Sequence, residues 1–223
     1  MRKSNFLFLA CIIGIYIFLP SILSGQGKIY LKNPSFEDKP RAGGQYSPPI
    51  KDWYDCGLQR FPEETPPDIH PVSSYAWQVS LKPYDGNTYL GLVVRYSATY
   101  ESVSQKLDYP MAVGKCYSMS IFLARSNQYL SGTPRSNTTL ENFTQPAILR
   151  IWGGNTFCEQ VELMAESEPV VNTEWKQYDF QFHPSKYYTY ITLEAYYTDS
   201  TKVAYNGHVL VDNCSPITVV ECK

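Results

Sequence analysis

Polar and aromatic side chains at alternate positions of three stretches, 88–96, 146–153 and 188–197, have the chemistry of a sugar-binding surface. Successive residues of a strand point to opposite faces of a sheet, and in each stretch one set is aliphatic. The other set includes Arg95, Arg150, Trp152, Glu194 and Tyr196. Arginine offers a planar fork of donors, glutamate accepts hydrogen bonds, and aromatic rings stack on sugar rings. Together these residues predict a saccharide-binding face opposite the core, partly covered by the loop at 127–146.

Arg125 is a further candidate for this face. Simple alternation gives it the direction of Ile121 and Leu123, so it joins the face only through a bulge or from the end of its strand. A second interpretation is that the face is solvated and that arginine and glutamate pair across strands, which contributes only a few tenths of a kcal/mol per pair. The alternation alone leaves both interpretations open.

Recognised catalytic motifs are missing from the sequence. The histidines, His70, His183 and His208, lie near no GxSxG, HExxH or CxxC pattern. Glu63 and Glu64 stand in a proline-rich stretch, which is a poor mount for an acid–base pair. The glycine-rich run 152–155 opens no predicted helix, so it is not a phosphate-binding loop. These observations predict a binding protein that is not an enzyme.

The elements that must position these residues are strands. The composition is 15% aromatic with 19 tyrosines, which is typical of β-sheet. About nine short strands with no long helix predict an all-β sandwich or barrel. The predicted strands are 28–33, 88–96, 101–108, 115–126, 146–153, 159–167, 174–182, 188–197 and 208–214.

Two long segments, 38–86 and 127–146, lack this alternation. Loops longer than about 15 residues inside a compact domain are uncommon and are often functional. The alternative is that they cover sheet edges. Glycosylation sequons at 137–139 and 142–144 place the second segment at the surface.

The first 25 residues resemble a cleaved secretory signal. Arg2 and Lys3 precede the apolar run 6–19, and Pro20 and small residues follow. We expect cleavage after Gly25 and a single domain over 26–223. An uncleaved membrane anchor is the alternative, because 6–23 is about long enough to span a bilayer, but the residues after it favour cleavage. No membrane span is expected once the signal is removed.

The charge and the cysteine content bear on the possible ligands and on the cellular compartment. The net charge of −2 shows no nucleic-acid footprint. The cysteines after the signal should form disulfides in an exported protein, and their odd number leaves one free or paired between chains. They are Cys56, Cys116, Cys158, Cys214 and Cys222. No paired CxxC is present, which argues against a zinc site.

The segments "LKNPSFED" (31–38) and "NGHVLVDN" (206–213) resemble the first and last strands of jelly-roll carbohydrate-binding modules, a galactose-binding-like fold. In that family a glutamate and an aspartate at these places bind structural calcium. The resemblance implies that Glu37 and Asp212 are calcium ligands together with backbone carbonyls, an oxygen donor set that calcium prefers. It also implies that 115–126 runs antiparallel to the final strand, which makes Cys116 and Cys222 the leading disulfide candidates.

A closer resemblance extends over most of the chain, through segments such as "GNTYLGLVVR" (86–95), "NTEWKQYDFQFHP" (172–184) and "YTYITLEAYY" (188–197). They look like a domain of exported Bacteroidetes proteins. That domain occurs alone, fused to outer-membrane peptidoglycan-binding domains, or in proteins linked to gliding motility and type IX secretion. The resemblance implies a jelly-roll β-sandwich, and we expect a lone module because no further domain follows in the sequence.

Two functions are compatible with this resemblance. The first is a non-catalytic, carbohydrate-binding-like module of the periplasm, the outer-membrane surface or the extracellular space, with a glycan as its ligand. The alternative is a protein-interaction subunit of an outer-membrane or cell-surface complex related to gliding motility or type IX secretion. Because one fold serves many functions, the fold does not decide between them.

Overall fold

The computed structural model describes residues 27–44, 47–57, 65–72, 77–133, 136–198 and 203–222. The predicted signal peptide, 1–25, lies outside these residues. In the described part every regular element is a strand, so the all-β prediction is confirmed. The strands are β1 (Lys28–Ile29), β2 (Tyr54–Asp55), β3 (Asp68–His70), β4 (Tyr89–Val94), β5 (Ser102–Met111), β6 (Cys116–Ala124), β7 (Leu130–Thr133), β8 (Ser136–Asn142), β9 (Gln145–Gly154), β10 (Glu162–Glu166), β11 (Lys176–Phe182), β12 (Tyr188–Tyr197), β13 (Gly207–Asp212) and β14 (Ile217–Val220).

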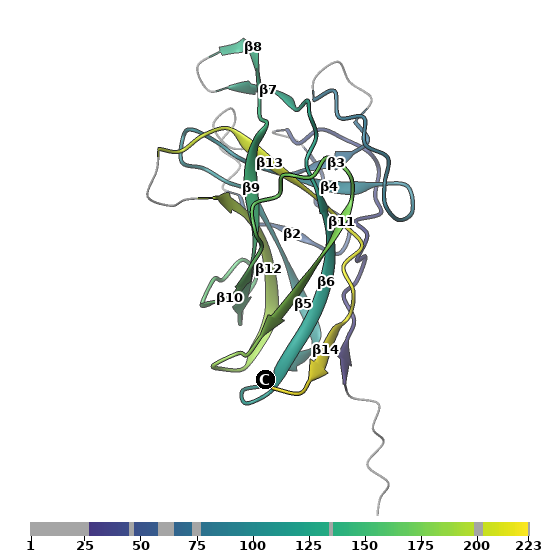
Figure 1. Cartoon of the computed structure of the whole chain (residues 1–223), viewed down its shortest axis with the longest axis vertical. Helices are drawn as coiled ribbons and strands as arrows, with labels where there is room; N and C mark the ends of the chain where they lie inside the picture. Colours follow the sequence, from purple (N-terminus) through teal and green to yellow (C-terminus); the bar gives the residue numbers. More distant parts are fainter. Residues whose placement is uncertain are drawn as a thin grey trace, which may run out of the picture.

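Most of these strands form one 12-stranded sheet that folds into two facing layers (Figure 1). The first layer contains β11, β6, β14, β1, β13, β4 and β3. The second runs in the order β10, β9, β12, β5, β2. The layers join where Gly207 and His208 of β13 pair in parallel with Gln145 and Pro146 of β9. This is a jelly-roll β-sandwich.

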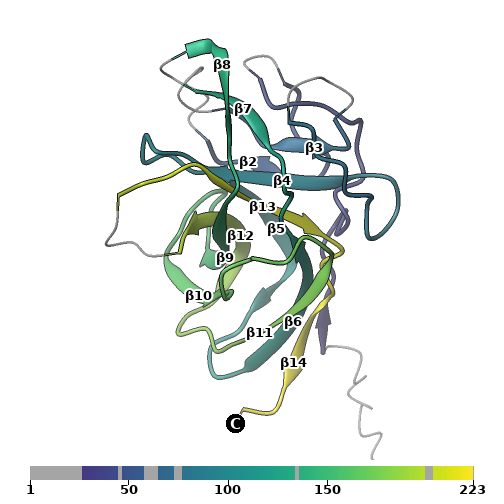
Figure 2. The same ribbon diagram turned by 45° about the horizontal axis from the view of Figure 1, so that its top comes forward.

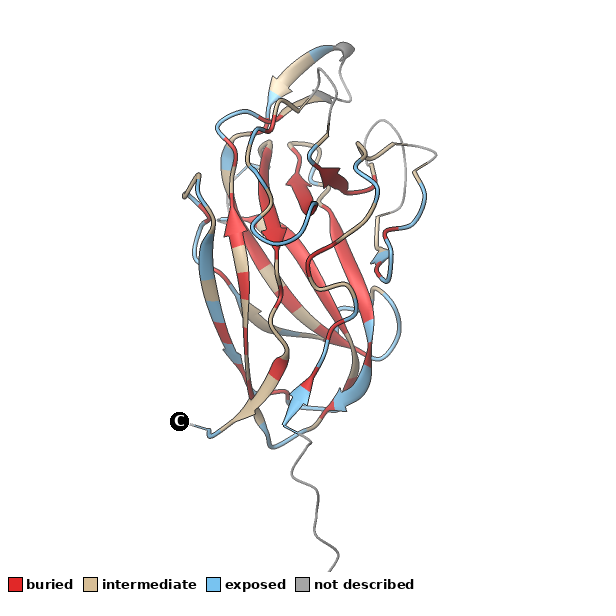
Figure 3. Cartoon of the chain, turned by 90° about the vertical axis from the view of Figure 1, so that its right-hand side faces the viewer, coloured by how far each residue is buried: buried red, intermediate tan, exposed pale blue. Residues whose placement is uncertain are grey.

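The main core lies between the layers and uses the aliphatic positions that alternation predicts. Leu90, Leu92 and Val94 of β4 are buried in it together with Leu193 and Ala195 of β12. Figure 3 shows the same pattern as long buried stretches along the central strands. The alternation of these strands is therefore confirmed, because their aliphatic sets share one interior.

A second hydrophobic cluster covers the outer face of the first layer. Tyr89 and Val93 of β4 point away from the main core and pack with Tyr129, Phe143 and Leu210. Tyr129 and Phe143 flank the β7–β8 hairpin, which forms within the polar segment 127–146. Figure 2 shows this hairpin at the same end of the molecule as β3 and β4. As a result, β4 is buried on both faces.

Two disulfides tie distant parts of the chain together. Cys116 at the start of β6 is bonded to Cys222, with the sulfurs 2.04 Å apart, so the pairing that the resemblance implies is present. The antiparallel pairing of β6 with β14, Cys116 opposite Val220, brings the two ends together. Cys56 is bonded to Cys158, a pair that the sequence did not single out. The remaining described cysteine, Cys214, is free and buried.

The structure also bears on membrane association. Within the described ranges, which exclude 1–26, there is no helix long and apolar enough to cross a membrane.

Candidate functional site

The structure brings four of the predicted face residues together on the outer side of the second layer. In the register of β12 and β9, Glu194 lies opposite Arg150, and Thr192 lies opposite Trp152. Tyr196 follows on the same side of β12, and its ring lies 3.6 Å from the Cζ atom of Arg150. The alternation therefore identifies a real cluster, while ligand binding by it stays a prediction.

The polar groups of this cluster are already engaged with one another. The indole N–H of Trp152 donates to Oε2 of Glu194 at 2.8 Å, and Nε2 of Gln160 donates to Oε1 at 2.7 Å. Arg150 donates through Nε to Glu166 at 3.2 Å. Glu194 is 1% exposed, and its burial raises the pKa of the carboxyl. The Glu194 carboxylate is therefore satisfied within the protein, while the Nη groups of Arg150 donate to no residue that the structure describes and its guanidinium lies over the Tyr196 ring.

A loop crosses over this face, and the register of the strands shows its path. We call residues 155–161, which join β9 to β10, the strap. The N–H of Cys56 donates to the carbonyl of Ser102 at 3.0 Å. Ser102 pairs with Glu194, and Glu194 pairs with Arg150. A disulfide from Cys158 of the strap to Cys56 therefore extends across β12 and β5.

The strap is held on the face by side-chain contacts as well as by the disulfide. Its Phe157 ring lies 5.6 Å from that of Tyr54, centroid to centroid, and its Gln160 binds Glu194. Polar residues of the face are consequently buried: Ser102, Ser104, Thr192 and Glu194. The prediction that the loop at 127–146 covers this face is wrong, because Tyr129 and Phe143 of that loop pack on the outer side of the first layer.

Arg95 does not join the cluster, which corrects its predicted place. It follows β4 of the first layer and forms a buried ion pair with Glu101, whose side chain is 2% exposed. Thr65 accepts a further hydrogen bond from its Nη2 atom at 2.9 Å. These bonds hold the 65–72 segment and the start of β5 to the end of β4.

Arg125 is also outside the cluster, but it lies at a recess. β6 ends at Ala124, so Arg125 extends from the strand end, which was one of the two arrangements expected for it. Nε donates to the carbonyl of Val171 at 3.0 Å, and Nη1 donates to that of Thr144 at 3.4 Å. These bonds fix the plane of the guanidinium, and its Nη2 group donates to no residue that the structure describes.

The recess beside Arg125 has a volume of about 750 Å³ and is built by three segments, 78–84, 125–128 and 173–175. Trp175 and Tyr84 contribute aromatic rings to its wall. The Trp175 indole donates to the carbonyl of Lys82 at 2.7 Å, and the Tyr84 ring stacks on Phe122 with centroids 3.5 Å apart. The recess thus combines fixed aromatic rings with polar groups, as ligand sites commonly do.

A buried histidine supports the floor of this recess. His208 of β13 accepts the N–H of Ser126 at Nε2, 2.7 Å away, and its Nδ1–H donates to the carbonyl of Phe143. Burial, with a smaller contribution from the charge of Arg125, lowers the pKa of His208 to about 4. It is therefore a neutral linker in the fold, not a titrating group at neutral pH.

Glu37 and Asp212, the predicted calcium ligands, hold one turn from two sides. Oε1 of Glu37 accepts the N–H groups of Asn87 at 2.8 Å and Thr88 at 3.1 Å. Oδ2 of Asp212 accepts the N–H groups of Tyr84 and Asp85 at 2.8 and 3.1 Å. These bonds explain why carboxylates follow or end the apolar strands at opposite ends of the chain.

The same turn requires glycine and brings a third carboxylate near the other two. Gly86 has a φ of +62°, and a Cβ there would lie 2.2 Å from Oε1 of Glu37, so only glycine fits. Asp85 adds a third carboxylate to the turn. Burial and, to a smaller extent, the charge of Asp85 raise the pKa of Asp212 to about 7. Carboxylate oxygens are donors that calcium prefers. Among the described residues, however, the ligand atoms of these three carboxylates do not all lie within 4.8 Å of one another, and calcium binding stays a prediction.

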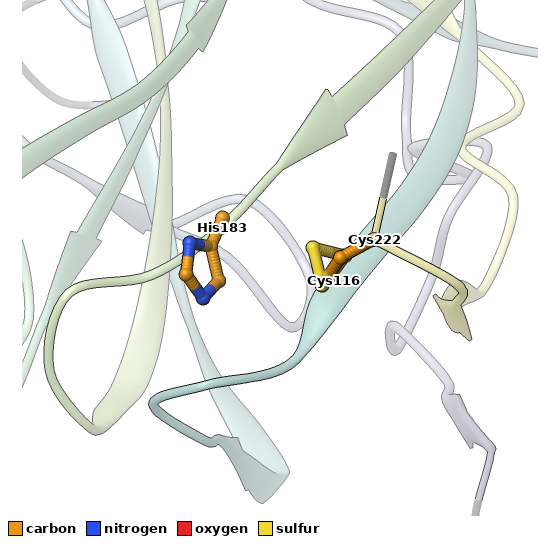
Figure 4. A group of neighbouring side chains, drawn as sticks. All are labelled: Cys116, His183 and Cys222. Atoms are coloured by element: carbon orange, nitrogen blue, oxygen red, sulfur yellow. A yellow bond between two sulfur atoms is a disulfide. The ribbon is translucent and has the colours of Figure 1, made fainter.

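A second group of potential metal ligands lies beside the Cys116–Cys222 disulfide. Ligand atoms of Cys116, His183 and Cys222 lie within 4.8 Å of one another. Figure 4 shows the imidazole beside the disulfide of the two cysteines. Because the thiolate is the metal-binding form of cysteine, this group is not a metal centre while the disulfide is intact.

Comparison with known proteins supports the fold. No protein-family model matches the chain, and no curated protein does. It is similar to a Stig cyclase from Fischerella sp. TAU, solved in complex with (3Z)-3-(1-methyl-2-pyrrolidinylidene)-3H-indole, with 13% identity over 88% of this chain and 99% of that chain and a TM-score of 0.53. A cyclase from Fischerella sp. TAU gives 11% identity, coverage of 88% and 98%, and a TM-score of 0.54. The CBM22-1 xylan-binding domain of Paenibacillus barcinonensis Xyn10C gives 14% identity over 88% of this chain and 97% of that chain, with a TM-score of 0.46.

These identities show a shared jelly-roll fold alone, but they correct one prediction. The lack of a recognised motif predicted that the chain is not an enzyme. The cyclases, with TM-scores of 0.53 and 0.54, contradict this prediction because their fold carries catalysis. A missing local motif does not exclude activity, since functional residues can be supplied by separate loops of a common fold.

Proposed function

We propose that this chain is an exported carbohydrate-binding-like module that binds a saccharide in the Arg125 recess. The observation that carries the proposal is the recess of about 750 Å³ with Trp175 and Tyr84 in its wall and an oriented guanidinium at its edge. Aromatic rings supply stacking area and the guanidinium supplies directed donors. The cluster predicted from the sequence is partly covered by the strap and its carboxylate is buried, so the recess is the more accessible candidate.

Export is supported by the disulfides. Cys56–Cys158 and Cys116–Cys222 are structural bonds, and such bonds persist in oxidising compartments. We place the protein in the periplasm, at the outer-membrane surface or outside the cell, in keeping with the signal-like N-terminus. A position at the cell surface is the setting in which a glycan ligand would be encountered.

The proposal is tested by measuring saccharide binding by isothermal titration calorimetry after a glycan-array screen. Tyr84→Ala removes an exposed ring from the recess and should weaken binding by about tenfold, or about 1.4 kcal/mol. Tyr30→Ala is the matched control, because Tyr30 is an exposed tyrosine on the edge of the first layer, outside the recess. Equal affinity of the Tyr84→Ala variant and the wild type, or no binding to any glycan, would overturn the proposal.

A second candidate function, protein interaction within a cell-surface complex, is favoured by one observation. Tyr54 and Phe157 are 52% and 62% exposed, and their neighbouring rings are held in place by the Cys56–Cys158 bond. Exposed, rigid aromatics are enriched at protein interfaces. A pull-down from native membranes with wild type and a Tyr54→Ser, Phe157→Ser variant tests this function. A specific partner that binds the wild type but not the variant would support this function. If both proteins capture the same partners, the Tyr54–Phe157 patch is not the interaction surface.

A further inference from the structure

We infer that the Arg125 recess selects saccharides that carry a carboxylate, the chemistry of a uronic acid. This inference rests on the proposed function, since it concerns which saccharide the same recess binds. Three observations support it: Arg125 has no carboxylate partner among the described residues, its guanidinium is held in a fixed orientation, and the wall of the recess carries more positive than negative charge.

Arg125 differs from the other arginines that the structure describes. Three of the four have a carboxylate within 4.0 Å: Arg41 with Asp38, Arg95 with Glu101, and Arg150 with Glu166. For Arg125, the described chain supplies backbone carbonyls but no carboxylate. An arginine that is oriented by carbonyls and lacks an anionic partner is prepared to receive one from outside.

The geometry of the remaining donors fits a carboxylate. A guanidinium has five N–H donors, and the bonds from Nε to Val171 and from Nη1 to Thr144 use two of them. Both N–H donors of Nη2 and one of Nη1 remain, and one donor from each of these two nitrogens can point in parallel. Parallel N–H donors match the two oxygens of a carboxylate, which gives a charge-assisted, directional contact that a hydroxyl cannot reproduce.

The charges along the wall point the same way. Lys82 also lines the recess and forms no ion pair within the described residues. Glu174 is the one carboxylate of the lining, and it is exposed. A net charge of −2 for the whole chain means that these two cations do not simply reflect a basic surface. Two cations against one carboxylate favour an anionic ligand in this recess.

The experiment compares saccharides that differ only in charge. Oligogalacturonates and oligomannuronates are titrated against the full-length mature protein beside their methyl esters, which keep the rings and remove the charge. Neutral xylo-oligosaccharides and sulfated galactan oligosaccharides complete the panel. We expect the free acids to bind at least about tenfold more tightly than the esters. Added salt should reduce this preference, because salt screens charge.

Variants assign the preference to the recess. Arg125→Gln should remove the difference between acid and ester, and Arg125→Lys should keep only part of it because the fork is lost. Lys82→Gln should reduce the preference for the acid over the ester while leaving the bonds from Arg125 to Val171 and Thr144 intact. It therefore tests the inference even if the Arg125 variants lose stability. Glu174→Gln should increase affinity for the acids. Circular dichroism and the melting temperature verify that each variant is folded.

The outcomes separate the inference from the proposed function. Neutral and acidic saccharides that bind equally well, with both weakened by Tyr84→Ala, would leave the proposed function standing and overturn the inference. A preference for the sulfated oligosaccharides over the uronates would also overturn it. If no saccharide of either charge binds, both statements fail.

Discussion

Glu194 lies directly opposite Arg150 in the pairing of β12 with β9, yet the hydrogen bonds of its carboxylate come from Trp152 and Gln160. Arg150 is bonded instead to Glu166, and its guanidinium covers the ring of Tyr196. The carboxylate of Glu194 is therefore satisfied without Arg150, and Arg150 is held by Glu166 and Tyr196. This arrangement gives the face a structural role that can be separated experimentally from ligand binding.

Trp152→Phe should lower the free energy of unfolding by about 1–3 kcal/mol, because a buried carboxylate loses one of its donors. Saccharide affinity should stay unchanged, since the strap covers the face. Arg150→Lys should have a smaller effect on stability, because Arg150 is bonded to the half-exposed Glu166. Urea denaturation and calorimetric titration measure the two quantities. A loss of affinity at full stability would instead favour the binding role predicted for these residues from the sequence.

Removal of the Cys56–Cys158 bond should release the strap. The two disulfides join residues 102 and 106 positions apart, so chain entropy assigns both nearly the same contribution, about 4.7 kcal/mol at most in that model. A Cys56→Ser, Cys158→Ser variant should show faster hydrogen exchange at 155–161 and around Trp152. A Cys116→Ser, Cys222→Ser variant is the control and should leave exchange there unchanged. Equal protection of the strap in both variants would show that side-chain contacts alone hold it.

We propose that calcium binds at the turn held by Glu37 and Asp212. A chelator should then lower the melting temperature of the wild type, and added calcium should restore it, because a ligand that binds only the folded state stabilises it. A Glu37→Gln, Asp212→Asn variant should melt lower and ignore the chelator. Asp108→Asn, which alters an exposed carboxylate on β5, is the control and should keep the wild-type response. A wild type that is indifferent to chelator would refute calcium binding.

His208 should contribute to stability above pH 6.5 and lose that contribution as the pH falls towards 4. Its pKa is lowered from 6.5 to about 4 in the folded state, so between these values the unfolded chain binds the proton and folding becomes less favourable. The loss attributable to His208 amounts to about 3 kcal/mol at most. In a His208→Gln variant, stability should fall less steeply over this pH range. Urea titrations from pH 4 to 7.5 measure the difference, and parallel curves would contradict the prediction.

Strand alternation accounts for what the sequence could predict. Leu90 and Leu193 reach one interior, while Arg150 and Glu194 point to the opposite side, because the two-residue period is local information. Alternation reports which side of a strand faces the core, but not which layer contains the strand. Alternation therefore predicted correctly that Arg95 lies on the side of β4 opposite the aliphatic set. It placed Arg95 with Arg150 and Glu194 wrongly, because β4 lies in the other layer.

The strap and the recess depend on contacts between distant segments, which no local pattern encodes. Among five cysteines, spacing alone does not select Cys158 as the partner of Cys56. The recess is assembled from three separated segments. Of its lining residues, only Arg125 was a predicted binding residue, and it was predicted to lie on the face that contains Arg150 and Glu194. The position of Trp175 at the start of a predicted strand was visible in the sequence, but its contact with Lys82 was not.

The second hydrophobic cluster sets a limit on how far this domain can be reduced. Tyr89, Val93 and Leu210 are covered in part by Tyr129 and Phe143, which flank the β7–β8 hairpin. A shortened scaffold without 127–146 would expose more of this apolar cluster to solvent, which is an aggregation liability. For an engineer, the segments that look most dispensable in the sequence are therefore part of the fold's minimal unit.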